Sequence, residues 1–255
     1  MIDTVASEWM KLRTVRSTLA LFASVVVALA SGALISYLMT ADHDRSSPAE
    51  RELFGAADPS TVVIPYAQIC AGVVGALCIA SEHGTGMIRS VLTAVPRRAE
   101  VLAAKAVVVG AVSLLFGLVT ALACAVSTLL ITGGRPAPIA PFASFADALP
   151  AVFAGAASVA VVGLVGLGLG ALVRSSAGAL MGVSVLLFVL PVVANLLPHP
   201  WNVRGAALTL PYLVPQLSGD VEGAPLTPLG AAAVAAGYLV LFLGAGGAAL
   251  LRRDA

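Results

Sequence analysis

Six long apolar stretches, none of which holds an Asp, Glu, Lys or Arg, limit what this chain can fold into. They cover residues 18–39, 62–80, 106–130, 151–173, 177–197 and 229–251. A helix needs about 20 apolar residues to cross a bilayer, and a charge placed there costs several kcal/mol. The sequence therefore predicts an all-α integral membrane protein with six transmembrane helices, built as one transmembrane domain over residues 1–255.

Composition agrees with this prediction. Of the 255 residues, 59% are hydrophobic and 11% are charged, whereas a soluble domain carries about 25% charged residues. The first apolar stretch runs unbroken to Met39, which is longer than the apolar region of a signal peptide, so we expect a retained helix. The three cysteines lie inside apolar stretches and form no CxxC pair, which favours reduced, packed side chains.

The basic residues predict the orientation. If the N-terminus is cytoplasmic, ten of the 14 Lys and Arg fall on the inner side and four on the outer side. Cytoplasmic loops carry an excess of Lys and Arg. Both termini of this multi-pass chain are therefore expected in the cytoplasm.

The outer loop over residues 198–228 is rich in Pro and contains Trp201 and Tyr212. Trp and Tyr favour the headgroup layer of a membrane. Two interpretations remain open for this loop: a short interfacial or re-entrant helix, or an ordinary surface loop.

The N-terminal segment, residues 1–17, shows a helical pattern. Ile2, Val5, Trp9 and Leu12 recur at steps of three and four, while Lys11, Arg13 and Arg16 lie mostly off that stripe. Such a helix lies flat on the inner leaflet, with its apolar face toward the lipid tails and its charges toward the phosphates. The alternative is an irregular basic tail.

The loop between the second and third apolar stretches, residues 81–100, predicts a second short helix. Gly84 and Gly86 interrupt the helix that leaves the membrane, and Thr85 can serve as the N-cap of a new turn. The apolar stripe that follows consists of Ile88, Val91, Leu92 and Val95. Pro96 ends the helix. Because so short a helix is marginal alone, its stripe needs a partner surface, either the membrane or another protein.

Several classes of site are missing from the sequence. There is no GxxxxGK[ST] and hence no P-loop for ATP. The three His residues are scattered over different loops without metal-ligand spacing, and no HExxH or GxSxG motif is present. Basic runs interleaved with aromatics, which would indicate nucleic-acid binding, are also missing. We therefore expect no catalytic residues, no metal site and no nucleic-acid partner.

The loop sequence resembles that of the permease subunits of type-2 ABC exporters, in particular their actinobacterial members. In those proteins a glutamate, a Gly-Thr-Gly-Met-Ile-Arg run and a Pro-Arg-Arg stop follow the second span. The residues that carry the resemblance are Glu82, His83, Gly84, Thr85, Gly86, Met87, Ile88, Arg89, Val91, Leu92, Val95, Pro96, Arg97 and Arg98, together with the run Val101-Leu102-Ala103-Ala104-Lys105 that follows them. The segment from Glu8 to Ser17 is similar to the N-terminal segment of the same family, and His83 stands where an aromatic residue is common.

The resemblance implies a function and partners. Residues 82–98 would be the coupling region that rests on a separate ABC ATPase, which would bind ATP and Mg; this chain itself would hold no cofactor and catalyse no reaction. A second permease copy or a related permease would complete the transporter in a bacterial cell membrane, in contact with membrane lipids. Because the six apolar stretches hold no charge, the exported substrate would be hydrophobic or amphipathic, such as a drug, lipid or peptide. In this setting Glu82 is expected in an exposed ion pair.

Gly163, Gly166 and Gly170 lie in the fourth stretch, where small residues let helices approach closely. They predict either an interface between two permeases or, as we favour, packing within the chain.

Two rival functions remain open. A secondary transporter would need polar groups near mid-membrane, and the candidates Gln68, Ser113 and Asn195 are weak. A non-transporting membrane scaffold or sensor anchor is the second rival.

Overall fold

The computed structural model describes residues 2–14, 16–87, 97–219 and 223–252, and these ranges contain helices and turns but no strand. A separate helix, α1 (Ile2–Thr14), precedes the first of the spans. Six helices are long and apolar enough to cross a membrane. They are α2 (Arg16–Arg45), α4 (Ser60–Gly84), α6 (Arg98–Thr132), α7 (Phe145–Val173), the composite of α8 (Ser176–Ser184), η1 (Val185–Val189) and α9 (Leu190–Asn195), and α12 (Pro228–Arg252).

The structure confirms the predicted all-α membrane fold with six spans. Most helices extend beyond the charge-free stretches that predicted them. The longest, α6, has 35 residues, which at 1.5 Å per residue makes roughly 50 Å. The hydrocarbon core of a bilayer is about 30 Å thick. The first turns of α6, which hold its charged residues, therefore reach past the apolar layer.

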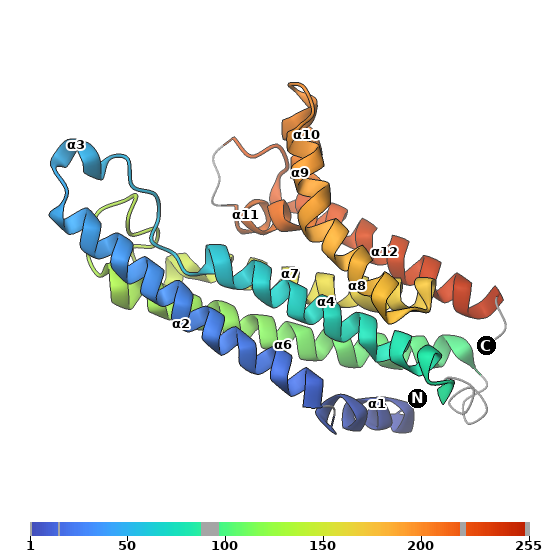
Figure 1. Ribbon diagram of the computed structural model, residues 1–255. Coiled ribbons are helices and arrows are strands. Elements are labelled where there is room, and N and C mark those ends of the chain that lie inside the picture. Colours follow the sequence, from blue (N-terminus) through green and yellow to red (C-terminus); the bar gives the residue numbers. More distant parts are fainter. Residues whose placement is uncertain (1, 15, 88–96, 220–222, 253–255) are drawn as a thin grey trace.

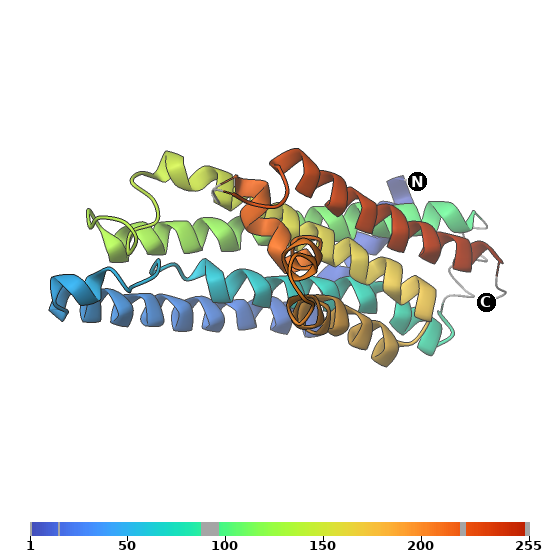
Figure 2. The ribbon, with the colours of Figure 1, turned by 90° about the horizontal axis from the view of Figure 1, so that it is seen from above.

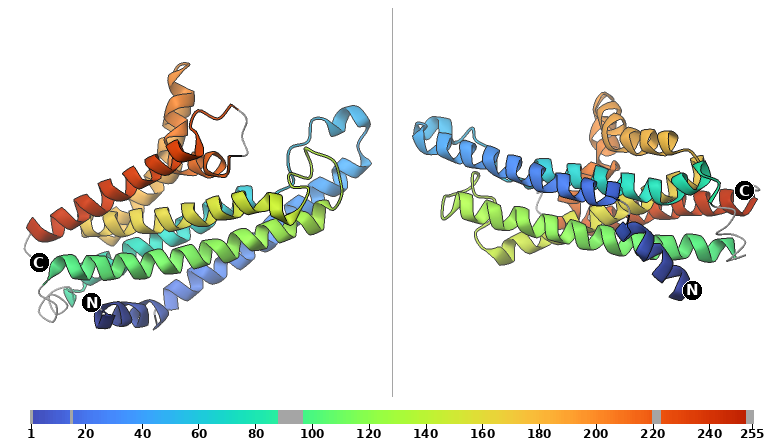
Figure 3. Two further views of the ribbon diagram at one scale, coloured as in Figure 1. Left: turned by 180° about the vertical axis from the view of Figure 1, so that it is seen from behind. Right: turned by 60° about the horizontal axis from the view of Figure 1, so that its bottom comes forward.

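Apart from the fifth span, whose α9 part stands off the bundle, the spans run side by side along the length of the molecule (Figures 1 and 2). The most buried span is α7, and it makes its largest contacts with α4, α6 and α12. Both termini and α1 lie at one end, which we call the terminal end; α3 (Pro48–Arg51) lies at the other, the α3 end (Figure 1). At the terminal end, α1 turns away from the direction of α2 (Figure 3).

Glycines allow α4 and α7 to pack closely. A Cβ on Gly166 would overlap the carbonyl of Gly72, and one on Gly75 would overlap the carbonyl of Gly163. A Cβ on Gly170 would stand 2.5 Å from the Ala76 carbonyl oxygen. The three glycines singled out in the sequence thus make their close contacts within this chain.

The segment after the fifth span folds back onto the bundle. It forms α10 (Trp201–Ala207), η2 (Leu210–Tyr212) and α11 (Leu213–Ser218). The α9–α10 pair projects from the bundle (Figures 1 and 3), whereas α11 packs against α7 and α12. The amide of Gln216 donates to the carbonyls of Ala207 and Tyr212. Residues 201–218 are therefore mostly short helices, of which α11 is seated on the spans.

At the α3 end, Arg135 joins the chain after α6 to the end of α2. Its Nε and Nη2 atoms donate to the two carboxylate oxygens of Asp44 at 2.9 and 2.7 Å. Its Nη1 atom also donates to the carbonyls of Ile131 and Thr132 in the last turn of α6. This paired geometry holds the two spans in register at the end opposite α1.

Candidate functional site: a buried charge cluster at the terminal end

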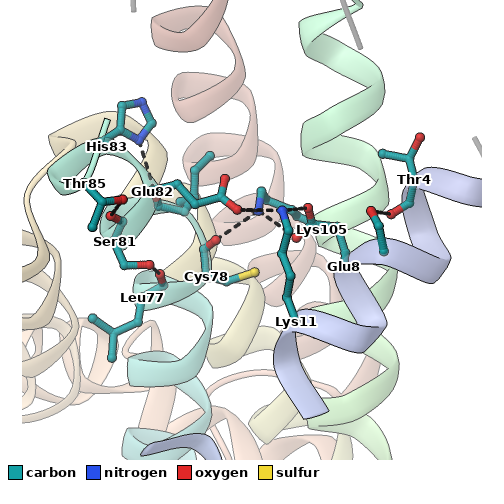
Figure 4. Close-up of polar contacts among 12 residues, drawn as sticks. Thr4, Glu8, Lys11, Leu77, Cys78, Ser81, Glu82, His83, Thr85 and Lys105 are labelled. Carbon is teal, nitrogen blue, oxygen red and sulfur yellow. Dashed lines mark hydrogen bonds and ion pairs between the residues drawn. The ribbon is translucent and has the colours of Figure 1, made fainter. Parts of the chain in front are cut away.

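Three segments far apart in the sequence bring four charged side chains together at the terminal end (Figure 4). Glu8 and Lys11 come from α1, Glu82 from the last turn of α4, and Lys105 from the second turn of α6. We call these four residues the charge cluster. Its two carboxylates and two ammonium groups balance to zero net charge.

Lys105 is the centre of the charge cluster. Its ammonium group donates to Glu8 Oε2 at 2.7 Å, to Glu82 Oε1 at 2.9 Å and to the carbonyl of Cys78 at 3.0 Å. An ammonium group has three donors, so all three are used. The side chain of Lys105 is 0% exposed. A buried Lys is stable as a cation only when it is paired in this way.

Lys11 closes the charge cluster on its outer side. It donates to Glu8 Oε1 at 2.7 Å and to Glu82 Oε1 at 2.9 Å, and its own side chain is 34% exposed. Burial lowers the pKa of Lys11, but the hydrogen bonds to Glu8 and Glu82 outweigh it, so the pKa is raised. Lys11 therefore stays protonated at neutral pH.

Glu8 and Lys105 lie in the segments that resemble the family, and the sequence around them also indicates that they are buried. Lys105 lies at helical spacing from Val101 and Val108, which are both buried, so its face of α6 points inward. Glu8 likewise shares a helix face with Val5 and Leu12. A charge on an apolar stripe indicates a buried partner, but nothing in the local sequence identifies that partner, and neither Glu8 nor Lys105 was among the predicted site residues.

The cluster joins three elements mechanically. Removing one member of a buried ion pair costs about 3–5 kcal/mol, because its partner stays buried without compensation. Separating α1 from α4 or α6 would break several such contacts at once. We infer that the three segments move together.

The expectation of an exposed ion pair at Glu82 was wrong. Glu82 is 3% exposed, and its Oε1 atom accepts from both Lys11 and Lys105. The reason is geometric: α4 continues to Gly84, so Glu82 still faces α6 and α1 instead of lying in a loop.

The chain turns sharply just after Glu82. α4 ends at Gly84, and Gly86 has a φ of 72°, a left-handed conformation that suits glycine. The hydroxyl of Thr85 donates back to the carbonyl of Ser81, so it closes the end of α4, whereas the sequence predicted a cap for the next helix. His83 Nδ1 lies 3.0 Å from the carbonyl oxygen of Ile79. Met87 is exposed.

The predicted coupling helix falls mostly on residues 88–96, which lie outside the described residues. Ile88, Arg89, Val91, Leu92, Val95 and Pro96 therefore remain sequence predictions. The chain is described again from Arg97, which is the N-cap residue of α6. Next to it, Arg98 donates to the carbonyl of Leu250 in the last turn of α12, which ties the far flank of the loop to the sixth span.

The apolar stripe predicted for α1 has one part packed against the bundle and another part exposed. Leu12 is buried and Val5 packs against the core formed by α4, α6 and α7, whereas Ile2 and Trp9 are exposed. Arg13 is exposed, and the side chain of Arg16 lies outside the description. Part of the predicted lipid-facing stripe is thus used to attach α1 to the bundle, while Ile2 and Trp9 are free to contact a membrane.

Within the ranges 2–14, 16–87, 97–219 and 223–252, no three His, Cys, Asp or Glu side chains gather in a way that could hold a metal ion. The carboxylates of the charge cluster contact ammonium groups instead.

A known protein family matches most of this chain. Residues 4–188 match the model of a family described as ABC-2 family transporter protein. The match runs from α1 into the fifth span and includes all four residues of the charge cluster. No curated protein matches the chain.

Proposed function

The chain belongs to the ABC-2 family of transporter proteins, and from this premise we propose that it exports a hydrophobic or amphipathic substrate with energy supplied by a separate ATPase subunit. A permease subunit of this family is a membrane transport component. The absence of a P-loop motif from the sequence supports a separate chain as the site of ATP hydrolysis.

The observation that carries the proposal is the charge cluster. The predicted coupling loop leaves α4 after Gly84, two residues beyond Glu82, and enters α6 at Arg98, about two turns before Lys105. The Glu82 Oε1 and Lys105 Nζ atoms are 2.9 Å apart. The two helices that flank the loop are therefore joined by the ion pair between Glu82 and Lys105. The ion pair between Lys105 and Glu8 joins them to α1. A force applied to the loop by a partner would move α1, α4 and α6 together.

A two-state mechanism follows. ATP shifts an equilibrium only if it binds one state more tightly than the other. ATP favours a closed ATPase dimer, and the clamped loop would connect that closed state to one arrangement of the spans. The charge-free spans support an apolar or amphipathic substrate, since their walls offer few polar groups.

The proposal includes placement and assembly. The ten-to-four distribution of basic residues supports cytoplasmic termini in a bacterial cell membrane. The terminal end, with the charge cluster, would then face the ATPase. One six-span chain would be half of a transporter, paired with a second copy or a related permease, and surrounded by membrane lipids.

Affinity purification from native membranes tests the proposal. A tagged chain should retain a second protein that carries a GxxxxGK[ST] motif, and the complex should hydrolyse ATP. If the chain instead transports in response to an ion gradient with no ATPase bound, it is a secondary transporter. If it binds an ATPase but moves no substrate in proteoliposomes, the scaffold interpretation replaces ours.

A further inference from the structure

A cavity of about 620 Å³ lies toward the α3 end, between α4, α6, α7 and α11. This volume falls within the range of small-molecule sites, about 300–1,000 Å³. From α4 it is lined by Thr61, Ile64, Pro65 and Gln68. These positions recur at steps of three and one, so they form one face of the helix. They extend the cavity about 10 Å along α4, at 1.5 Å per residue.

Small side chains on the neighbouring helices leave this space open. Ala121 and Ala125 face it from α6, and Ala148 and Ala151 from α7. Val214 of α11 closes one side. The inner part is apolar, so an apolar body placed there would be shielded from water.

The deepest polar group in the cavity has an unused acceptor. Gln68 is 1% exposed, and its amide nitrogen donates to Ser158 Oγ at 3.0 Å. Its Oε1 atom is buried and accepts no hydrogen bond from the described residues. A buried acceptor left without a donor is destabilising, so a ligand N–H that reached Gln68 Oε1 would be stabilised there.

More acceptors lie closer to the α3 end. Pro65 has no N–H, so it cannot donate the helical hydrogen bond to the carbonyl of Thr61. Half-buried Asp58 and exposed Asp147 line the cavity near the starts of α4 and α7. Within the described ranges, neither carboxylate forms an ion pair with a Lys, Arg or His.

The hydroxyl groups that line the cavity already donate hydrogen bonds to other groups of the protein. The hydroxyl of Ser60 donates to the Asp58 carboxylate, that of Thr61 to the Asp58 carbonyl, and that of Ser218 to the Pro215 carbonyl. The Asp58 carboxylate also accepts from Thr128 Oγ1 at 3.0 Å, and the Asp147 carboxylate accepts from Ser144 Oγ at 2.9 Å. All of these donors are neutral, so the negative charge of the two carboxylates is not compensated by them. A complementary ligand carries N–H donors and positive charge at one end.

We propose that this cavity binds an amphipathic amine whose ammonium group lies at Asp58 and Asp147 and whose apolar body carries a further N–H that donates to Gln68 Oε1. The assignment of this ligand as an exported substrate rests on the proposed function. Binding itself does not, because the cavity lies within a single chain and away from the charge cluster.

Equilibrium binding to the purified full chain in nanodiscs of zwitterionic lipid tests the site without any ATPase. The probe is dansylcadaverine, a primary amine with a fluorescent aromatic body, compared with its N-acetylated form, which has the same body without the charge. Empty nanodiscs correct for partition into lipid. The amine should bind saturably, and at least about tenfold more tightly than the acetylated probe, because a charge-assisted hydrogen bond is about twice as strong as a neutral one.

Variants locate the site. Asp58→Asn combined with Asp147→Asn should weaken amine binding about tenfold and leave binding of the acetylated probe unchanged; Gln68→Leu should weaken both probes. Asp42→Asn removes an exposed carboxylate at the same end, outside the cavity lining, and should change neither. Thermal unfolding should show that each variant is folded. Because Asp58 accepts from Thr128 of α6, its replacement is expected to lower the melting temperature, whereas Asp147→Asn alone, at an exposed position, should weaken amine binding without that loss.

Equal affinity for the two probes would overturn the proposal, as would unchanged amine binding in the folded Asp58→Asn/Asp147→Asn variant. Amine binding with the expected variant pattern, but no ATPase on the purified chain, would support the site while contradicting the proposed function. If an ATPase co-purifies with the chain but the cavity variants bind the amine normally, the proposed function is supported and the proposed site is contradicted.

Discussion

Lys105 and Glu8 are 97 residues apart in the sequence, yet the Lys105 ammonium donates to Glu8 Oε2 at 2.7 Å. Both side chains are almost fully buried, at 0% and 1% exposure. This pair fixes α1, which the sequence assigned to the membrane surface, onto the start of the third span. It makes α1 a structural part of the bundle as well as a candidate membrane-contacting helix.

Removal of the central ammonium should destabilise the protein strongly. Lys105→Met keeps most of the side-chain volume but leaves Glu8 and Glu82 with Lys11 alone, at a cost of about 3–5 kcal/mol. Lys11→Met is the matched control, since that side chain is 34% exposed and a more exposed pair contributes about 1 kcal/mol or less. Unfolding of the purified variants in denaturing detergent measures the difference. Equal loss of stability in both would show that burial of Lys105 is not what makes the cluster strong.

The six spans could be predicted from the sequence because the absence of charge over 20 residues is a strong physical constraint. The ends of the helices were less predictable. Residues 98–105 and 40–45, which contain charged side chains, continue α6 and α2 beyond the apolar layer. Because a search for charge-free apolar stretches stops at the first charged residue, it does not find these extensions. The helical folding of residues 201–218 was one of two open interpretations, since Trp201 and Tyr212 fit either.

The charge cluster could not be assembled from sequence. Glu82 was found through its motif, but its burial depends on α4 continuing to Gly84 and on α1 covering it. Glu8 and Lys105 each sit on an apolar face, which shows that a partner is needed. Which partner each one meets depends on tertiary packing, and local spacing holds no information about that.

Close packing of α4 on α7 makes a second stability prediction. Gly166→Ala would place a methyl group against the Gly72 carbonyl, and overpacking of this kind costs about 1–3 kcal/mol. Gly237→Ala in α12 is the control, because nothing lies within 4 Å of its added Cβ and Ala favours a helix by up to about 1 kcal/mol. The melting temperature should fall for the first variant and hold or rise for the second. A rise for both would mean that α4 and α7 are farther apart than described.

The orientation can be read from cysteine labelling in a chain whose native cysteines are replaced. Leu53→Cys lies at the α3 end and Met10→Cys lies in α1, and both positions are well exposed. An impermeant maleimide added to whole cells should modify the first and reach the second only after permeabilisation. The opposite pattern would invert the predicted topology.

Membrane contact of α1 can be measured through Trp9, which is exposed. In a Trp201→Phe background, lipids brominated at a shallow depth should quench its fluorescence, because the free part of the α1 stripe would lie at the headgroup level. Quenching by aqueous iodide alone would show that α1 is held on the bundle without touching lipid.

The decisive test of coupling through the terminal end is the amount of ATPase that co-purifies with loop variants. Leu92→Asp places a charge on the predicted docking stripe, where an unpaired buried charge costs several kcal/mol, or orders of magnitude in affinity. Thr93→Asp is its control, next in sequence but off the stripe. Both variants lie outside the spans and should reach the membrane in normal amounts. We predict that Leu92→Asp loses the ATPase while Thr93→Asp keeps it; full retention by Leu92→Asp would contradict coupling through this loop.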